Sequence, residues 1–398
     1  MARTGISIVV ANTTVGDSQP VNSNTLLVVV GATAASGGSL QFELYTPYMI
    51  QSADELETLL GVTEENNADL YKQVNDFYAP MPGVNNSGTI LWVVGTKSPN
   101  TGVTEKLADW VRATVTSGFQ YRPRNIVIST DPTVEGIAQS DVQTVIDELY
   151  TEGFATVCFL AEAQLPEGAI TAIYSSSLPD LSTENAPAVG TCIVTNVLKG
   201  RACVGALSGL HVSLSLGASV GDAGLQSFAD SLWYIDKAEG AYVNTPCASV
   251  PLAVVNTLGD KQYIFARTRP PKNGLWWNDG ATAAEATTSL STIEASAVIA
   301  AMVDDLREFL TPYINSKVPC NANGDIDPTY KQVVIDNARS AVITPYVEDG
   351  VISDARITIN AQNNDMIGTR TWEVTLEILD APTLRWINGK VFYVKSLE

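Results

Sequence analysis

The sequence predicts an α/β and α+β fold, in which an N-terminal and middle α/β domain with a mixed sheet precedes a C-terminal α+β domain. From Asn24 to about Asp260, short apolar runs alternate with helical patterns. After a change in composition near Arg267, two helices precede strands in which apolar and polar residues alternate. Both ends of the chain also read as strands without an obvious partner nearby in the sequence. We therefore expect extended N- and C-terminal strand arms.

Local signals bound the first elements of the α/β domain. Residues Leu26–Gly31 predict a buried strand. Ser52 predicts the start of a helix as its N-cap, with Glu55 completing a capping box and Gly61 ending the helix. Residues Ala68–Tyr78 predict a second helix, because their apolar side chains recur on one face.

The same alternation continues through the middle of the chain. Strands are predicted at Ile90–Val94, Asn125–Ser129 and Ala155–Leu160, and a helix at Ser140–Tyr150. This order favours a mostly parallel sheet. The stretch 201–221 is rich in Gly, Ala and Ser, and it is compatible with either a tightly packed helix or a loop of close approach.

The helices of the C-terminal domain carry their own start signals. A long helix is predicted from about Ser291 to Ile314, with Ser291 and Glu294 as its capping box. A second helix begins with Asp327 as N-cap and Pro328 at the first helical position, and it continues to about residue 343.

Antiparallel strands are expected to close this domain. Ile357 and Ile359 alternate with polar neighbours in the first strand. In the second strand the alternating apolar residues predict one buried and one solvated face; they are Trp372, Val374, Leu376 and Ile378. The dipeptide Asn388-Gly389 predicts a type I′ hairpin that links residues 384–387 to 390–394.

The length of 398 residues suggests two or three domains. We expect an N-terminal strand arm over 1–22 and an α/β region over 23–260, whose subdivision near 100–120 is left open. A C-terminal α+β domain is expected over 261–385, followed by a strand arm over 386–398.

Composition excludes several classes of function. Charged residues make up only 17% of the chain and apolar residues 45%, which is typical of a folded protein with sizeable interfaces. The net charge of −20 disfavours nucleic acid as a partner. No apolar run approaches the ~18 residues that span a bilayer, so no direct membrane insertion is expected. The five cysteines lack a disulfide pattern, and they favour core thiols of a soluble protein made in a reducing cytosol.

Candidate chemical sites are weak. The single histidine, His211, excludes a multi-histidine metal site, and a structural role is favoured over catalysis. The loop 31–38 follows a strand and is glycine-rich, but it lacks the G-x-G-x-x-G pattern. A turn is favoured there, and a soluble α/β enzyme or nucleotide-binding protein with a ligand site near 31–38 remains the alternative. We predict no catalytic residue, metal or cofactor, and therefore no enzyme.

Other conspicuous residues have structural explanations. The segment Asn321–Asp327 resembles part of a calcium loop, but a turn followed by a helix cap accounts for it better. The pair Asp304-Asp305 predicts solvated helix charge. For Trp276 and Trp277, core packing is favoured over contact with a neighbouring subunit.

Three blocks of this sequence resemble contractile tail sheath proteins, the family that coats the inner tube of contractile bacteriophages and related injection systems. They cover the two ends and roughly half of the chain, by pattern rather than by alignment. The blocks are Thr4–Val9 with Leu27–Ala32 and Ile50–Gly61; Arg267–Pro270 through Trp277–Gly280 into the following helix; and Asp327–Val394.

The resemblance implies a structural subunit that polymerises as hexameric, helical rings around an inner tube and contracts to drive it through a target envelope. The implied partners are copies of itself, the inner tail tube protein, and baseplate and tail terminator proteins. The implied location is the virion tail sheath, assembled in the host cytoplasm. A bacteriophage, a secretion apparatus and an extracellular injection system all remain open, and a surface-layer subunit is a third, less favoured class.

The resemblance also implies strand exchange between subunits. The donor residues would be Gly5, Ile6, Ser7, Ile8, Val9 and Val10 at one end, and Val391, Phe392, Tyr393 and Val394 at the other. The acceptor sheet would contain Trp372, Val374, Leu376 and Ile378. Lys331 and Arg339 share a helix face and are candidates for tube contact, with a solvated helix face as the alternative.

Overall fold

The computed structural model describes residues 24–100, 102–131, 136–161, 178–196, 201–222, 224, 232–238, 241–269, 272–322, 324–359 and 371–381. The chain divides into two compact units between Val318 and Pro319. Each unit has its own sheet. The fold is α/β in the first unit and α+β in the second, as predicted.

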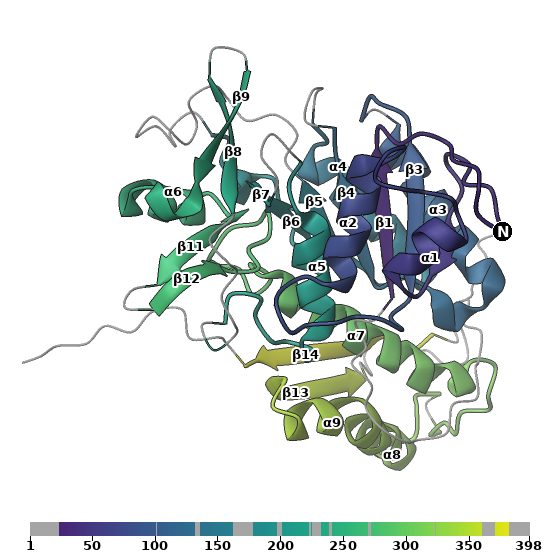
Figure 1. Cartoon of the computed structure of the whole chain (residues 1–398). Coiled ribbons are helices and arrows are strands. Elements are labelled where there is room, and N and C mark those ends of the chain that lie inside the picture. Colours follow the sequence, from purple (N-terminus) through teal and green to yellow (C-terminus); the bar gives the residue numbers. More distant parts are fainter. Residues whose placement is uncertain are drawn as a thin grey trace, which may run out of the picture. The chain divides into compact units, whose positions relative to one another are not determined.

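The first unit is built on a seven-stranded mixed sheet (Figure 1). Every neighbouring pair is parallel except β2 and β3, which are antiparallel. In spatial order the strands are β10 (Tyr263–Ile264), β6 (Val189–Cys192), β5 (Val157–Ala161), β4 (Asn125–Ser129), β1 (Thr25–Val30), β3 (Leu91–Thr96) and β2 (Tyr48–Ile50).

The strand order makes this a doubly wound sheet. From β3 through β1, β4 and β5 to β6, the order is the 2-1-3-4-5 arrangement of open parallel sheets. Because crossover connections are right-handed, the reversal of direction at β1 places the helices before and after β3 on opposite faces. Helices α2 (Ala68–Tyr78) and α5 (Val204–Ser213) pack together, and so do α3 (Val103–Thr114) and α4 (Gln139–Glu152) (Figure 1).

Burial on both faces explains the composition of the strands. All residues of β1, β3, β4 and β5 are buried. A strand covered on both sides gains nothing from a polar face, so it reads as a continuous apolar run rather than an alternating one. The predicted strands therefore agree with the structure, and β4 and α2 agree at both ends.

In the undecided stretch 201–221, a close approach occurs at Gly221, where a Cβ would lie 2.6 Å from the carbonyl oxygen of Asn278, and residues Val204–Ser213 form the tightly packed helix α5. Its two glycines face the backbone of α2 directly. A Cβ on Gly205 would lie 2.2 Å from the carbonyl oxygen of Gln73, and one on Gly209 would lie 2.3 Å from that of Phe77. The Asn86 side chain then donates to the carbonyls of Phe77 and Gly209 at 2.8 and 2.7 Å. Glycine is required here because no side chain fits between the two helices.

The remaining helices and strands of the first unit surround this core. They are α1 (Ala53–Thr58), α6 (Leu252–Asp260), α7 (Ile293–Leu310), β7 (Val194–Thr195), β8 (Trp233–Ala238), β9 (Ala241–Pro246), β11 (Ala266–Arg269) and β12 (Lys272–Trp277), with 3-10 turns at Val115–Ser117, Phe119–Tyr121, Leu181–Thr183, Cys247–Ser249 and Thr311–Tyr313. Trp276 and Trp277 are both buried, as expected for core packing.

The second unit pairs one antiparallel sheet with helices. Helix α8 (Pro328–Ala338) runs through a π-helical turn, Arg339–Ile343, into α9 (Thr344–Glu348). Strands β13 (Ile352–Ile359) and β14 (Val374–Asp380) pair with Ile357 opposite Leu376. Asp327 caps α8 as predicted, because its carboxylate accepts from the backbone N–H groups of Thr329 and Tyr330 at 2.9 and 3.1 Å.

The two predicted capping boxes were wrong. Ser52 is at the N-cap of α1 but makes no side-chain cap, and Glu55 accepts instead from the N–H of Gln51 at 2.7 Å. The cap of α7 is Thr292, not Ser291, and Glu294 accepts from the N–H of Val220 at 2.9 Å. In both cases the acidic residue satisfies a neighbouring donor rather than the N-cap.

The division into units does not coincide with the expected limit near residue 260. Strand β10 joins the large sheet, and α7 packs against β5. The long helix before Pro319 therefore belongs to the first unit by packing. The sequence-based limits of the arms and domains stay predictions.

Replacing Gly209 by Ala should lower the free energy of unfolding by about 3 kcal/mol, because the added methyl group collides with the α2 backbone. Gly259→Ala is the matched control. It also lies in a helix, but its Cβ would meet Phe265 only at 3.9 Å, so a gain of up to about 1 kcal/mol is expected. Denaturant titrations measure both values, and equal effects would contradict the close approach of α2 and α5.

Candidate functional site

The carboxyl ends of β1 and β4 form the crevice in which a doubly wound sheet binds a ligand. The side chain of Arg201 fills it. The guanidinium donates to the carbonyl of Val30 at the end of β1 and, at 3.3 Å, to that of Ser129 at the end of β4. Its Nε pairs with the carboxylate of Asp69 at 2.8 Å, and the side chain is only 8% exposed. A buried, paired guanidinium therefore occupies the place of a ligand.

The glycine-rich loop 31–38 uses its backbone for internal contacts. The N–H of Ala32 donates to Thr96 O at 2.9 Å, and that of Thr33 donates to the Asn67 side chain at 2.7 Å. Gly38 packs against the backbone of Leu59, where a Cβ would lie 2.3 Å from the carbonyl oxygen. The loop is thus fastened to β3 and to the segment after α1.

His211 lies on α5 and is 1% exposed. Its ring and the ring of Phe159 form a T-shaped contact, with ring centroids 5.2 Å apart. Among the described residues neither ring nitrogen has a hydrogen-bond partner. Burial lowers the pKa of His211 to about 4, so the ring is neutral near pH 7. These surroundings fit a packing role.

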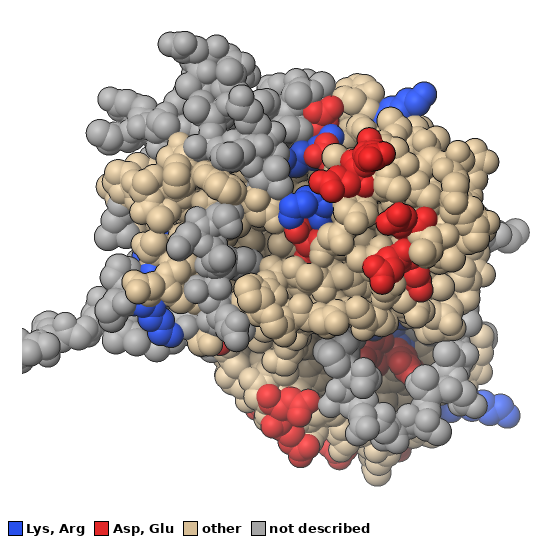
Figure 2. Space-filling model, viewed as in Figure 1, with Lys and Arg blue, Asp and Glu red and all other residues tan. Residues whose placement is uncertain are grey.

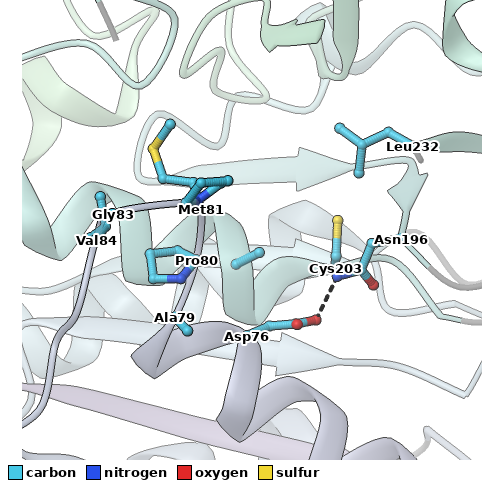
Figure 3. A pocket seen from close by; sticks show the side chains of 11 residues that line it. Asp76, Ala79, Pro80, Met81, Gly83, Val84, Asn196, Cys203 and Leu232 are labelled. Atoms are coloured by element: carbon cyan, nitrogen blue, oxygen red, sulfur yellow. Dashed lines mark hydrogen bonds between the residues drawn. The ribbon is translucent and has the colours of Figure 1, made fainter. Parts of the chain in front are cut away.

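A pocket of about 450 Å³ lies between the end of α2 and the start of α5 (Figure 3). Its charged group, the Asp76 carboxylate, already pairs with Lys72 and accepts from the Asn196 amide at 2.8 Å. The Cys203 thiol at its wall has a pKa well above the usual value, because Cys192 lies beside it and both are buried. A protonated thiol is a weak nucleophile, so this pocket offers no activated group.

The remaining candidates are structural in the described part of the chain. The N–H of Asp325 donates to the Asn321 side chain at 3.0 Å, and Asp327 then caps α8. No cluster of three or more His, Cys, Asp or Glu side chains suited to a metal occurs among the described residues. None of the helices placed by the structure is both long and apolar enough to span a membrane.

One prediction about charge was wrong. Asp304 is not solvated: its carboxylate is 6% exposed and lies 2.7 Å from Arg122, 3.1 Å from Arg124 and 3.7 Å from Arg307. Its arginine partners come from a segment about 180 residues earlier in the chain and from the same helix. No local pattern in the sequence signals this network.

The predicted acceptor residues lie together on β14 and just before it. Trp372, Val374, Leu376 and Ile378 are all half-buried, whereas the residues between them are exposed. On β13, by contrast, the inward residues are fully buried; they are Ile352, Ala355, Ile357 and Ile359. The predicted donor strands Gly5–Val10 and Val391–Val394 lie outside the described residues.

The two predicted tube-contact residues differ in their surroundings. Arg339 donates to the Asp354 carboxylate at 2.8 Å and to the Ala355 carbonyl at 3.0 Å. The pKa of Asp354 lies below its usual value. The main cause is the hydrogen bond from the N–H of Ala355, and the second is the hydrogen bond from Arg339. Lys331 is half-buried on α8.

Acidic side chains gather in several groups on the face of the described residues seen in Figure 2, with basic groups beside only some of them. This agrees with 43 acidic against 23 basic residues in the whole sequence. Copies of such a chain repel one another at long range, so any assembly must gain free energy from close contacts.

Solved structures share this fold. The chain is similar to a protein of the PVC sheath complex of an extracellular contractile injection system in the contracted state, at 12% identity over 99% of this chain and 98% of that chain, with a TM-score of 0.60. It is also similar to a protein of the anti-feeding prophage (AFP) baseplate, at 11% identity over 99% of each chain, with a TM-score of 0.57. The predicted resemblance to contractile tail sheath proteins is confirmed at the level of the fold.

Residues 4–281 match the family described as DUF2586, N-terminal domain. This match covers more than half of the 398 residues, and the chain belongs to the DUF2586 family. No curated protein matches the sequence.

Saturating ATP, GTP or NAD should leave the melting temperature unchanged, because Arg201 fills the crevice. A nucleotide that binds the native state at a hundredfold excess over its Kd would add ~2.7 kcal/mol to the free energy of unfolding. A thermal shift assay distinguishes the two outcomes, and a clear rise with any of the three would restore the ligand-binding alternative.

His211 should make the fold sensitive to acid. Its folded pKa of about 4 lies below the value of 6.5 expected when unfolded, so between these pH values only the unfolded chain takes up the proton. The stability that His211 contributes is present above pH 6.5 and falls by roughly 3 kcal/mol toward pH 4. Plots of the free energy of unfolding against pH for the wild type and His211→Gln should therefore converge or cross as the pH falls. Parallel plots would contradict a buried neutral ring.

Proposed function

We propose that this chain is a structural subunit of a contractile tail sheath, which polymerises as helical rings around an inner tube and contracts to drive the tube through a target envelope. The observation that carries the proposal is the likeness in fold to a protein of the PVC sheath complex across 99% of this chain. The filled ligand crevice supports a structural role over a nucleotide-binding one.

Strand addition at β14 is the contact that we propose to hold copies together. Within the described residues, β14 pairs only with β13, and its other edge has no partner strand among them. Such an edge recruits an extended segment through main-chain hydrogen bonds. The half-burial of Val374, Leu376 and Ile378 supports this, because the inward residues of β13 are buried where α8 and α9 pack on that strand, and the side chains of an added strand would extend the cover over β14.

The donors in this proposal are the segments Gly5–Val10 and Val391–Val394 of neighbouring copies. Both are rich in β-branched and aromatic residues, and Gly5–Val10 is close in length to the seven residues of β14. Main-chain hydrogen bonds need no charged side chain, so they can supply free energy that offsets the repulsion between copies of net charge −20.

The further partners in this proposal are an inner tube protein, baseplate proteins and a tail terminator protein, with the assembled sheath as the location. Lys331 and Arg339 remain proposed tube contacts. Since Arg339 is already paired with Asp354, a tube carboxylate would have to displace or share that partner. Lys331 is the simpler candidate.

Deleting residues 1–12 or 389–398 should abolish assembly and leave soluble monomers. Negative-stain electron microscopy of the protein alone, and mixed with the tube protein of the same system, is the measurement. Hollow cylinders of uniform diameter are expected for the wild type only.

A matched pair of point variants tests strand addition without deleting any residue. In an added strand successive side chains lie on opposite faces of the sheet, so Ile8→Asp places a charge on the apolar face while Ser7→Asp places one on the solvated face. Cylinders with Ser7→Asp and none with Ile8→Asp support the proposal. Cylinders with both variants and both deletions would exclude strand exchange, and dispersed wild-type protein in the presence of the tube would exclude the sheath role.

A further inference from the structure

Asn24, the residue before β1, is held by four hydrogen bonds to one distant segment. Its side-chain Nδ2 donates to the carbonyls of Gln120 and Arg122 at 2.8 and 3.1 Å. Its own carbonyl accepts from the N–H groups of Arg124 and Asn125 at 2.9 and 3.2 Å. Both the side chain and the backbone of one residue are thus fixed to the segment that leads into β4.

Ion pairs to α7 hold the segment 120–125 in place. The guanidinium groups of Arg122 and Arg124 lie 2.7 and 3.1 Å from the Asp304 carboxylate, which is almost fully buried. The Arg122 guanidinium also lies 4.3 Å from the centroid of the Phe119 ring. A buried ion pair of this kind tolerates little displacement, because moving one partner leaves an uncompensated charge. The segment that holds Asn24 is therefore a rigid support.

The strand that follows Asn24 is the best-supported one in the sheet. β1 pairs in parallel with β3 over Thr25–Val30 and with β4 over Thr25–Val29. A pull directed along β1 loads both ladders of hydrogen bonds together, whereas a pull across the sheet would open them one at a time. Which of these occurs depends on the direction in which the chain enters β1.

We propose that Asn24 is a positioning residue that fixes the start of β1 to residues 120–125, so that a load applied through the segment 1–22 enters the fold at Asn24. It directs a load on that segment along β1 and, through Arg122 and Arg124, into α7. The occupant at the far end of the segment would be a second copy of this chain, and only that part rests on the proposed sheath function. The anchoring of Asn24 stands on the contacts of the single chain.

The test compares Asn24→Ala with Asn85→Ala. Both substitutions remove an asparagine that makes two side-chain hydrogen bonds, but those of Asn85 are local contacts to Ser87. Hydrogen exchange of the monomer should be about tenfold faster at the amides of Thr25, Arg124 and Asn125 in Asn24→Ala only. The global denaturation midpoint should stay close to that of Asn85→Ala.

Electron microscopy of the same proteins with the tube protein gives the second readout. Asn24→Ala should form fewer or shorter cylinders than Asn85→Ala despite equal folding. Unchanged exchange at the three amides would overturn the anchor, and faster exchange with normal cylinders would overturn its positioning role. If the wild type forms no cylinders, the proposed sheath function fails, while the exchange result still decides whether Asn24 is an anchor.

Discussion

Coverage of both faces of the parallel sheet is the constraint on which this structure depends. Strands β1, β3, β4 and β5 have no polar face, so helices must shield them on each side. The pairs α2–α5 and α3–α4 do this, and the reversal at β1 leaves a crevice at the carboxyl edge. Arg201 closes the crevice with a charge that Asp69 balances. A doubly wound sheet usually binds a ligand at this edge, but in this structure Arg201 occupies it.

The two units differ in how completely their strands are covered and their polar groups are paired. The first covers its sheet, fills its crevice and pairs Asp304 with three arginines. In the second, β13 is covered, while β14 is half-covered and has one edge without a partner strand among the described residues. Unsatisfied backbone groups and half-exposed apolar faces are what a protein uses to recruit another chain. This asymmetry is why we place the contact between copies on β14 rather than on the large sheet.

The sequence predicted those elements whose signals are local. Buried strands, α2 and the Asp327 cap follow from runs and caps within a few residues. Helix α5 stayed undecided because it is buried all round and has no polar face to reveal its period. The crevice filling and the Asp304 network could not be predicted, because Arg201 and Val30 are 171 residues apart and Arg122 and Asp304 are 182 apart. Long-range charge pairing has no sequence period.

The glycine contacts between α2 and α5 have a mechanical consequence. Helices packed through side chains can slide by small rotamer changes, but here backbone meets backbone at Gly205 and Gly209. Neither helix can translate past the other without losing these contacts and the two carbonyl bonds of Asn86. The contact between α2 and α5 therefore resists sliding. A change of shape that slid one of these helices along the other would break both glycine contacts, so other parts of the chain offer easier places for movement.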